Sequence, residues 1–297
     1  LLPLLHPGDR ALLPADGYGA TRALAAEHLT PRGVHVDLVA TQGLAHADLS
    51  GYDLVLVETP SNPGLRVVDL ADVAARAHAN GRRDGAGALV VVDNTLLTPL
   101  GQRPLELGAD VVVASDTKAV NGHTDALGGH VASRDPQVMA RVRGWRTLAG
   151  GILGTHEAWL IHRGLETLEV RFARMCASAQ AVAELAAGHP AVRAVVYPGL
   201  ADHPDAEVVA RQMTAAGGLV GLRFADAAAA ERFIAAAQYV VPQTSFGGTH
   251  TAAERRARWG DDVPDGFVRL SVGVEPTAEL LADLERAMTA AGGGPTA

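Results

Sequence analysis

Runs of apolar residues alternate with amphipathic stretches over the first half of the chain. Near-continuous Val, Leu and Ala runs predict strands at 10–15, 34–40, 53–58, 88–94, 109–115 and 128–133. A helical period of apolar residues predicts helices over about 21–28 and 67–79. Continuous apolar runs, as opposed to strict alternation, are typical of parallel strands that helices cover on both faces. The first half therefore predicts an α/β fold with a mostly parallel, doubly wound sheet.

The pattern changes in the second half. Residues 157–187 read as one long helical region, and the strands and helices after it are mixed in a different order. Strands are predicted at 192–198, 218–226 and 267–275, and helices at about 226–237 and 277–288. We expect two domains: an α/β domain over residues 1–160, and a long linking helix with a smaller C-terminal α+β domain over residues 161–297.

Composition narrows the class of protein. Of the 297 residues 48% are apolar and 20% are charged, which is typical of a globular protein with a substantial core. The formal net charge is −8 and the basic residues are scattered, so we expect no nucleic-acid partner. We also expect no membrane partner, because no apolar stretch approaches membrane-spanning length. Cys176 is the only cysteine, which excludes an intrachain disulfide and fits a cytoplasmic location.

Three consecutive predicted strands end in polar groups. Glu58 ends the first, Asp93 ends the second, and the third runs into Ser115-Asp116-Thr117-Lys118. Each group alone reads as a turn or a cap, and most lysines are simply solvated. In open α/β sheets, however, ligands bind beyond the carboxyl ends of the strands. Two carboxylates and an amine at one sheet edge therefore indicate a binding site.

One chemistry needs this combination of groups. A lysine that forms a Schiff base with pyridoxal 5′-phosphate requires a carboxylate for the pyridine nitrogen and hydroxyl donors for the phosphate. Asp93 is placed to be that carboxylate, and Ser115 and Thr117 flank Lys118 as phosphate ligands. Burial and a cationic cofactor would lower the pKa of the amine, so that it can act as base and nucleophile. The sequence thus predicts pyridoxal 5′-phosphate as the cofactor.

The stretch ASDTKAVNGHTDALGG (114–129) resembles a known lysine motif, Ser-x-Thr-Lys…Gly-His-x-Asp…Gly-Gly. This known motif is characteristic of the Cys/Met-metabolism family of pyridoxal-phosphate enzymes, which includes cystathionine γ-lyase, cystathionine γ-synthase and methionine γ-lyase. Further stretches resemble the family in the family's order: HPGDRALLPADGYGATR, VETPSNP, VVDNTLLTPLGQRPLELGADVVV, EAWLIHRGLETLEVR, VVYPGL, TSFGGTHT and VRLSVGVE. The resemblance spans nearly the whole chain and implies the fold-type I architecture of these enzymes.

The resemblance implies roles for five residues at the cofactor. Lys118 is similar to the Schiff-base lysine, and Asp93 to the partner of the pyridine nitrogen. Tyr18 resembles the tyrosine that stacks on the cofactor ring, where offset stacking adds about 0.5–1.5 kcal/mol beyond burial. Ser115 and Thr117 resemble the hydroxyl ligands of the phosphate. The catalytic residues implied are Lys118, Tyr18 and Asp93.

Five further residues are placed at the ring or the substrate by the same resemblance. Asn62 resembles the amide near the phenolic oxygen of the ring, and Glu58 lies on the substrate side. Arg269, which alone would read as part of a surface ion pair, resembles the arginine that binds the substrate α-carboxylate with its bidentate fork. Ser245 belongs to the Ser-x-Gly-Gly loop beside the lysine. Thr244 stands where cystathionine-cleaving members often have glutamate.

The chain departs from the family pattern at several positions. Ala119 stands where members usually have tyrosine, and Ala20 replaces a glycine. The resemblance begins at Pro7-Gly8-Asp9, so we expect the N-terminal part of the cofactor domain to be missing. In the family that part supplies a Gly-Met phosphate loop and a Tyr-x-Arg pair that reaches the phosphate of the neighbouring subunit.

Other readings of the sequence stay open at this point. The Gly17-Tyr18-Gly19 stretch faintly resembles a dinucleotide loop, but Arg22 occupies the place of its third glycine. The pair His123 and His130 has no fixed ligand spacing, so we expect no metal site. Cys176 lies in a helical stretch and is more typical of a core residue than of a nucleophile. A non-catalytic binding protein on the same fold is an alternative of a different class.

The resemblance implies an enzyme of cysteine and methionine metabolism. Its expected reaction is a γ-elimination on sulfur amino acids, with cystathionine γ-lyase activity first and cystathionine γ-synthase or methionine γ-lyase activity as alternatives. Analogy with the family also implies a homotetramer built from active dimers.

Overall fold

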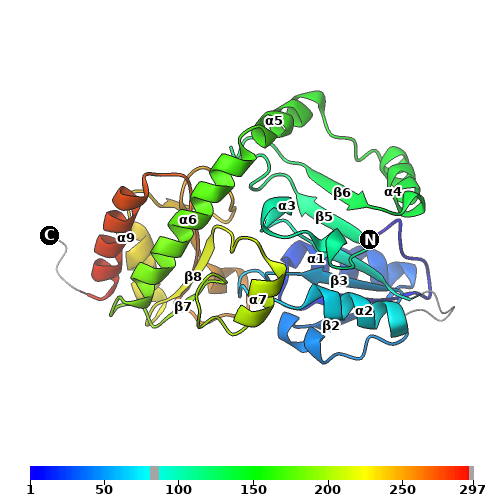
Figure 1. The fold of residues 1–297 in the computed structure, drawn as a ribbon, viewed down its shortest axis with the longest axis horizontal. Coiled ribbons are helices and arrows are strands. Elements are labelled where there is room, and N and C mark those ends of the chain that lie inside the picture. The colour runs from blue at the N-terminus through cyan, green and yellow to red at the C-terminus, as the bar shows by residue number, and fades with distance from the viewer. Residues whose placement is uncertain (81–86, 294–297) are drawn as a thin grey trace.

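The computed structural model describes residues 1–80 and 87–293, and its first half forms a six-stranded sheet (Figure 1). The strands are β1 (Arg10–Pro14), β2 (His35–Val39), β3 (Leu54–Glu58), β4 (Leu89–Asp93), β5 (Val111–Ser115) and β6 (Gly129–Ser133). Their order in the sheet is β2-β1-β3-β4-β5-β6. Every neighbouring pair is parallel except β5 and β6, which are antiparallel. The prediction of a mostly parallel sheet is confirmed.

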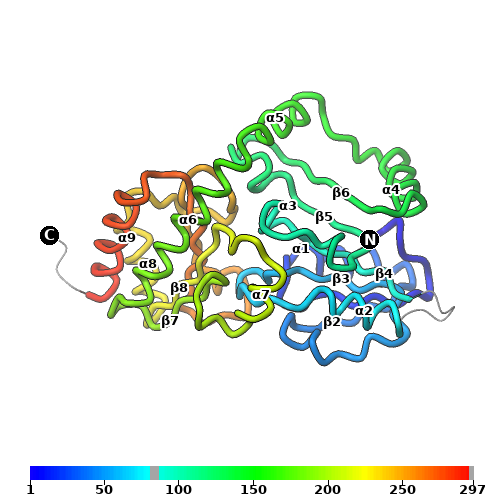
Figure 2. Tube along the Cα trace, viewed as in Figure 1, coloured from blue at the N-terminus to red at the C-terminus, as the bar shows by residue number. Residues whose placement is uncertain are grey.

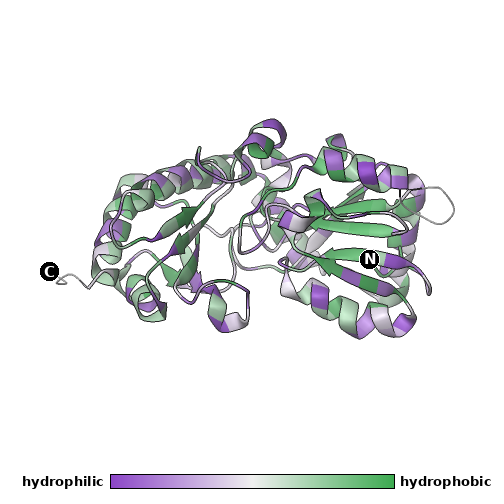
Figure 3. Cartoon of the chain, turned by 90° about the horizontal axis from the view of Figure 1, so that it is seen from below, coloured by the Kyte–Doolittle hydropathy of each residue, from purple (hydrophilic) through white to green (hydrophobic). Residues whose placement is uncertain are grey.

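Helices cover both faces of this sheet. On β3, Val55 and Val57 pack into one hydrophobic cluster with α2 (Leu70–Asn80), while Leu54 and Leu56 pack into a second cluster on the opposite face. That second cluster includes residues of the π-helix η1 (Ala25–Leu29) and of α4 (Pro136–Ala149). Successive strand residues point to opposite faces, so a continuous apolar run supplies both cores. Figure 3 shows these hydrophobic strands enclosed by helices of mixed hydropathy.

Shorter elements connect the strands and helices of the first half. They are α1 (Gly19–Leu24), η2 (Thr30–Arg32), η3 (Thr41–Ala45), α3 (Thr98–Gly101) and η4 (Pro104–Glu106). The helix predicted at 21–28 corresponds to α1 and η1 together. Helix α4 was not expected, because Val138 is its only buried residue and no apolar period marks it. Its start could have been found from Asp135-Pro136, since the Asp135 carboxylate caps the helix by accepting from the Gln137 N–H at 2.7 Å.

The region 157–187 is helical as predicted, but a short break divides it. Two helices occupy this region, α5 (Thr155–Leu165) and α6 (Leu168–Ala187). The buried Arg171 guanidinium donates to the carbonyl of Gly164 at 2.7 Å, and it also donates to the carbonyls of Ala119 and Val120. In an unbroken helix the Gly164 carbonyl would accept the backbone N–H four residues later. Arg171 therefore joins the Gly164 carbonyl at the break to two carbonyls that follow β5.

The second half forms a five-stranded sheet of its own. Its strands are β7 (Ala194–Val196), β8 (Leu219–Arg223), β9 (Val241–Pro242), β10 (Ala252–Arg255) and β11 (Phe267–Ser271), in the order β7-β8-β11-β10-β9. All pairs are antiparallel except β9 and β10. The remaining helices are α7 (Ala206–Gln212), α8 (Ala227–Ala236), η5 (Arg256–Trp259) and α9 (Thr277–Ala291). This mixture is the expected α+β architecture, although α7, β9 and β10 were not predicted.

Helix α6 connects the two halves (Figure 2). Near its start, Leu168 and Phe172 pack against Ala119 and Val120, which follow β5. Its later residues join the core of the second sheet with α8 and α9. The division of the chain near residue 160 stays a prediction. Within the described ranges no helix has the length and hydropathy that crossing a membrane requires.

Candidate active site

A cavity of about 250 Å³ lies where β3, β4 and β5 end and meet the second half of the chain. Nine of the ten predicted site residues line it: Tyr18, Glu58, Asn62, Asp93, Ser115, Thr117, Lys118, Thr244 and Arg269. The tenth, Ser245, contacts Lys118 directly. The three predicted strand ends converge because β3, β4 and β5 are adjacent in the sheet.

Lys118 follows β5 in a tight turn. Its Nζ donates to Ser245 Oγ at 2.9 Å and lies 5.0 Å from the centre of the Phe246 ring. Burial, and then the positive charge of Arg269, lower the pKa of the Lys118 amine below its usual value. A lysine with a lowered pKa is unprotonated more often near neutral pH and can then act as a nucleophile or a base.

Two carboxyl groups face each other at the strand ends. Glu58 on β3 is the register partner of Asp93 on β4. Burial raises the pKa of Asp93, and burial followed by the negative charge of Asp93 raises the pKa of Glu58 to about 8. Asp93 Oδ1 accepts from the Thr95 hydroxyl at 2.5 Å, and Glu58 Oε2 accepts from the Tyr18 N–H at 2.6 Å. In the part of the chain that the structure describes, neither carboxylate has an ion-pair partner.

Arg269 on β11 supplies the opposite charge from the second half of the chain. Its guanidinium is buried, and it donates to Asn62 Oδ1 at 2.6 Å and to the Thr244 carbonyl at 2.5 Å. Burial lowers the pKa of Arg269 to about 10. Across residues 1–80 and 87–293 no acidic side chain lies within ion-pair distance of it. A buried guanidinium without an anion is ready to receive a carboxylate ligand.

Hydroxyl groups complete the wall next to the lysine. Thr117 Oγ1 accepts from the Gly128 N–H at 3.1 Å, and the Ser115 side chain lines the cavity. Tyr18 also lines the cavity and is 58% exposed, so it is accessible to a planar ligand. The hydroxyl groups and the tyrosine ring, together with the Lys118 amine and the Asp93 carboxyl group, fit the set of groups that pyridoxal phosphate requires.

The loop that carries Thr244 and Ser245 approaches the lysine closely because it contains glycine. Gly247 has φ of +77°, and a Cβ at this position would lie 2.7 Å from the Ala119 backbone nitrogen. Any other residue would push the loop, and with it Ser245, away from Lys118.

Sequence reasoning missed two residues of the site. Thr95 bonds Asp93 and also accepts from the Ser115 N–H at 2.9 Å, so it ties β4 to β5. Its position two residues after Asp93 is the spacing of an Asx turn, which could have indicated it. The Phe246 ring contacts both cations: its centre lies 5.0 Å from the Lys118 Nζ and 5.1 Å from the Arg269 Cζ. No local signal in the sequence marks this role.

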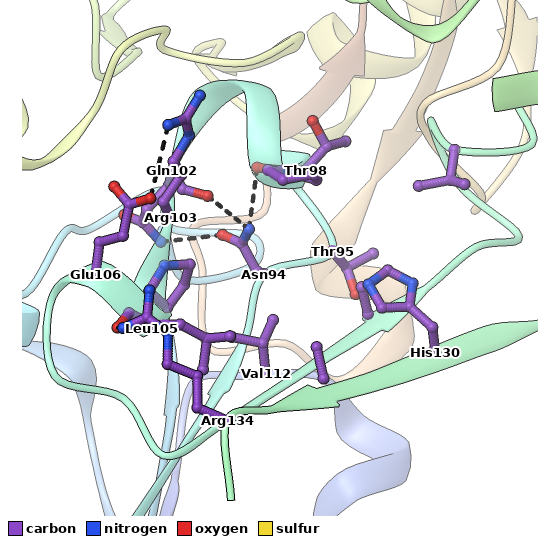
Figure 4. A pocket seen from close by; sticks show the side chains of 15 residues that line it. Asn94, Thr95, Thr98, Gln102, Arg103, Leu105, Glu106, Val112, His130 and Arg134 are labelled. Atoms are coloured by element: carbon purple, nitrogen blue, oxygen red, sulfur yellow. Dashed lines mark hydrogen bonds and ion pairs between the residues drawn. The ribbon is translucent and has the colours of Figure 1, made fainter. Parts of the chain in front are cut away.

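A second cavity, of about 340 Å³, also has Thr95 in its wall, and Figure 4 shows the residues that line it. Its polar groups are already paired with one another: Asn94 Nδ2 donates to the carbonyls of Thr98 and Gln102 at 3.0 and 2.9 Å. His130, on its wall, bonds Asp116 at 2.6 Å. This cavity contains none of the ten predicted residues and is not the candidate site.

The remaining sequence hypotheses can be placed as well. His123 Nδ1 contacts the Asn121 carbonyl at 2.7 Å, and among the residues described no three acidic, His or Cys side chains are grouped to hold a metal. Burial raises the pKa of the Cys176 thiol to about 11, which makes it a poor nucleophile. The Gly17-Tyr18-Gly19 stretch, which faintly resembles a dinucleotide loop, leads into α1: Gly19 is the first residue of this helix, which ends at Leu24 and continues as η1.

The fold and the site define a pyridoxal-phosphate-dependent enzyme. The chain matches the model of the Cys/Met metabolism PLP-dependent enzymes over residues 1–289, and it belongs to this family. The predicted resemblance and cofactor are confirmed, and the protein is a carbon–sulfur lyase by family.

Related proteins differ in their named activities. A Streptomyces coelicolor protein provisionally named cystathionine gamma-lyase is 48% identical over 290 residues, which are 97% of this chain and 72% of that protein. The L-methionine gamma-lyase of Pseudomonas deceptionensis is 40% identical over 97% of this chain and 75% of its own length. Cystathionine gamma synthase from Xanthomonas oryzae pv. oryzae, solved with aminoacrylate and cysteine, matches with a TM-score of 0.91 at 34% identity. That match covers 99% of this chain and 78% of the solved one.

Proposed function

We propose that this protein cleaves cystathionine by γ-elimination, in which one water is consumed and cysteine, 2-oxobutanoate and ammonia are formed. The observation that carries the proposal is the placement of Lys118 and Arg269 against the same aromatic ring, that of Phe246, in the wall of one cavity. Binding and activating an α-amino acid requires two groups. An amine with a lowered pKa acts at its α-carbon, and a buried guanidinium without an anion binds its carboxylate.

The residues near the lysine would hold the cofactor. We assign covalent attachment to Lys118, ion pairing with the ring nitrogen to Asp93, and stacking on the ring to Tyr18. The hydroxyls of Ser115 and Thr117 would bind the phosphate, and the Asn62 amide would lie near the phenolic oxygen. When bound, pyridoxal phosphate supplies an electron sink for the negative charge that develops at the substrate α-carbon. A cationic ring nitrogen would also lower the repulsion between Asp93 and Glu58.

The other residues would act on the substrate. Arg269 binds the α-carboxylate and Asn62 holds the guanidinium in place, so that the α-carbon is directed toward Lys118. Lys118 then removes the proton at Cα and moves protons at Cβ, and Ser245 orients its amine through the 2.9 Å hydrogen bond. Thr244 and Glu58 would face the distal end of the substrate, where Glu58 offers a carboxylate to the second ammonium of cystathionine.

Methionine γ-lyase activity is the second candidate. The observation that favours it is Thr244, a neutral hydroxyl at the position where a glutamate would bind the distal ammonium. Charge-assisted hydrogen bonds are about twice as strong as neutral ones, so this site discriminates less strongly for cystathionine. γ-Replacement on an O-acylhomoserine is the third possibility, because the same residues would serve it.

Product analysis tests the proposal. The purified protein with pyridoxal phosphate is given cystathionine, methionine, or an O-acylhomoserine with cysteine, and the products are separated by mass. We expect cysteine and 2-oxobutanoate from cystathionine at the highest kcat/KM. Pyruvate and homocysteine from cystathionine, or cystathionine formed from the O-acylhomoserine as the main product, would contradict it.

We also propose a homotetramer built from active dimers. Large apolar side chains are exposed over α4, α5 and the loop between them, which lie together along one side in Figure 1: Trp145, Leu148, Ile152, Leu153 and Trp159. An exposed apolar area of this kind is typical of a subunit interface. Light scattering coupled to gel filtration should give four times the chain mass. Conversion to dimers by Leu148→Glu together with Ile152→Glu would identify this patch as one of the two interfaces of the tetramer, and an unchanged mass would exclude it.

A further inference from the structure

The loop between β3 and α2 carries Asn62 into the active site and is closed on itself. The Ser61 N–H donates to the Arg66 carbonyl at 2.8 Å, and the Arg66 N–H donates to Ser61 Oγ at 3.2 Å. The Leu65 N–H also donates to the Ser61 carbonyl at 2.9 Å. Residues 61–66 therefore move as one unit, and whatever holds Arg66 also holds Asn62.

A bidentate ion pair fastens this loop to the second half of the chain. Arg66 Nε donates to Asp205 Oδ2 at 2.7 Å, and Arg66 Nη2 donates to Oδ1 at 2.6 Å. The Val67 N–H donates to Asp205 Oδ2 at 2.8 Å. Both side chains are largely shielded, with 25% and 13% exposure, so water weakens this pair less than one on the open surface.

The carboxylate of Asp205 is directed away from its own helix. Asp205 is the N-cap residue of α7, a position where aspartate usually accepts from the first backbone N–H groups of the helix. Here its side chain makes no such bond, and all its hydrogen bonds go to residues 66 and 67. The Asp205 side chain therefore stabilises the loop and does not cap the helix.

The adjacent His203 holds the same loop at a second point. Its Nε2 contacts the Leu65 carbonyl at 3.1 Å, and its Nδ1 accepts from the Asp205 N–H at 3.2 Å. Leu65 is fully buried and has φ of +54°, a conformation that a leucine keeps only where its surroundings impose it. The segment 203–205 therefore determines the shape of the loop as well as its position.

We propose that Asp205 and Arg66 are positioning residues for substrate recognition. They fix the loop that carries Asn62, and Asn62 Oδ1 in turn holds the Arg269 guanidinium at 2.6 Å. The inference rests on the proposed function in one respect, the assignment of Arg269 to an α-carboxylate. Its consequence is that a residue of α7, outside the cavity wall, sets the affinity of the enzyme for amino acids.

The test compares three variants of the purified protein with bound pyridoxal phosphate. Asp205→Asn removes the charge with little change of shape, and Arg66→Lys keeps the charge but removes the fork. Arg211→Gln is the matched control, because Arg211 lies on the same helix and makes a 2.7 Å ion pair with Asp69 just outside the loop. The probe is L-alanine, an α-amino acid without a γ leaving group, and its Kd is followed by the absorbance of the bound cofactor.

We expect the Kd of L-alanine to rise about tenfold in Asp205→Asn and severalfold in Arg66→Lys, and to change less than twofold in Arg211→Gln. The same variants are compared by amide hydrogen exchange, with and without pyridoxal phosphate. Exchange should accelerate at residues 61–68 in the first two variants only. A double variant Arg66→Lys with Asp205→Asn should bind L-alanine no more weakly than the worse of its two single substitutions, because the pair acts as one unit.

Two results would overturn the inference: an unchanged Kd in both Asp205→Asn and Arg66→Lys, or unchanged exchange in the loop. If Asp205→Asn fails to fold, Arg66→Lys decides, since it keeps the charge and the surrounding contacts. Failure of the proposed γ-elimination leaves both readouts intact, because L-alanine binding and hydrogen exchange require no turnover. The two proposals can therefore fail separately.

Discussion

Two cavities meet at Thr95, and they differ in how their polar groups are satisfied. The larger one, of about 340 Å³, is lined by groups that bond one another, such as Asn94 with Gln102. The smaller one, of about 250 Å³, contains Lys118, Arg269, Glu58 and Asp93, and the described residues form no ion pair with any of the four. Burying ionisable groups without a partner is costly and shifts their pKa, so such groups are typical of a site where a ligand supplies the partner. Unpaired ionisable groups, and not volume, identify the site.

Of the substitutions that test this difference between the two cavities, Asp93→Asn should have the largest effect on activity. We expect turnover to fall about a thousandfold, because the amide cannot stabilise a cationic ring nitrogen. The protein should still fold, since an amide oxygen can accept from Thr95 as the carboxylate does. Steady-state kinetics and thermal unfolding measure both effects. Glu106→Gln in the larger cavity is the control and should leave turnover unchanged; near wild-type turnover in Asp93→Asn would reduce Asp93 to a turn residue.

Arg269→Lys should raise the KM for an amino-acid substrate about ten- to a hundredfold with a smaller change in kcat. Lysine keeps the charge but cannot bind a carboxylate in two places while also holding Asn62. The matched substitution in the larger cavity is Arg134→Lys, which concerns a side chain that donates to the Leu105 carbonyl at 2.9 Å. Equal KM values in the two variants would remove Arg269 from substrate binding.

Glu58 makes the stability of the cofactor-free protein depend on pH. Its pKa is about 8 in the folded chain and 4.5 as the ordinary value, so between these pH values the folded chain holds a proton that the unfolded chain releases. The free energy of unfolding therefore falls as pH rises from 4.5 to 8. Glu58→Gln cannot titrate and should be more stable than wild type by about 4 kcal/mol at pH 8, with no difference near pH 4.

Urea unfolding of the wild type and Glu58→Gln at pH 4, 6 and 8 measures this effect. Glu106→Gln, an exposed carboxyl on the larger cavity, should follow the wild type at each pH. Parallel stability curves for the wild type and Glu58→Gln would show that Glu58 is ionised in the folded chain.

Thr244→Glu should produce the smallest effect, a change in preference. We expect the ratio of kcat/KM for cystathionine to that for methionine to rise severalfold, because the new carboxylate meets the distal ammonium of cystathionine. Thr244→Gln has a similar size without the charge and serves as the control. A wild type without methionine activity, and a ratio unchanged by the glutamate, would show that this position does not set specificity.

Local sequence patterns predicted one half of the site better than the other. Asp93 and Lys118 could be placed together because consecutive parallel strands bring their carboxyl ends to one edge. Arg269 lies 207 residues from its partner Asn62, and no periodicity or spacing connects them. Only the resemblance to a family placed Arg269 at the site. Long-range packing of the second sheet against the first is the physical information that local patterns lack.

The same limit explains the errors in the fold. At the break between α5 and α6, the Arg171 guanidinium bonds the Gly164 carbonyl and also carbonyls 51 and 52 residues away. An apolar period continues across this break, so the pattern reads as one helix. Helix α4 was missed for the opposite reason: it has a clear capping residue, Asp135, but almost no buried face, so no apolar period marks it.

Labelling of Lys118 tests the central claim most directly. The purified protein is incubated with pyridoxal phosphate, reduced with borohydride, digested and mapped by mass spectrometry. We predict that the pyridoxyl label lies on Lys118, the only lysine of the chain, and that Lys118→Arg carries none. A wild-type protein that takes up no label, or a label of equal extent at the N-terminal amine, would contradict the assignment of this cavity as the active site.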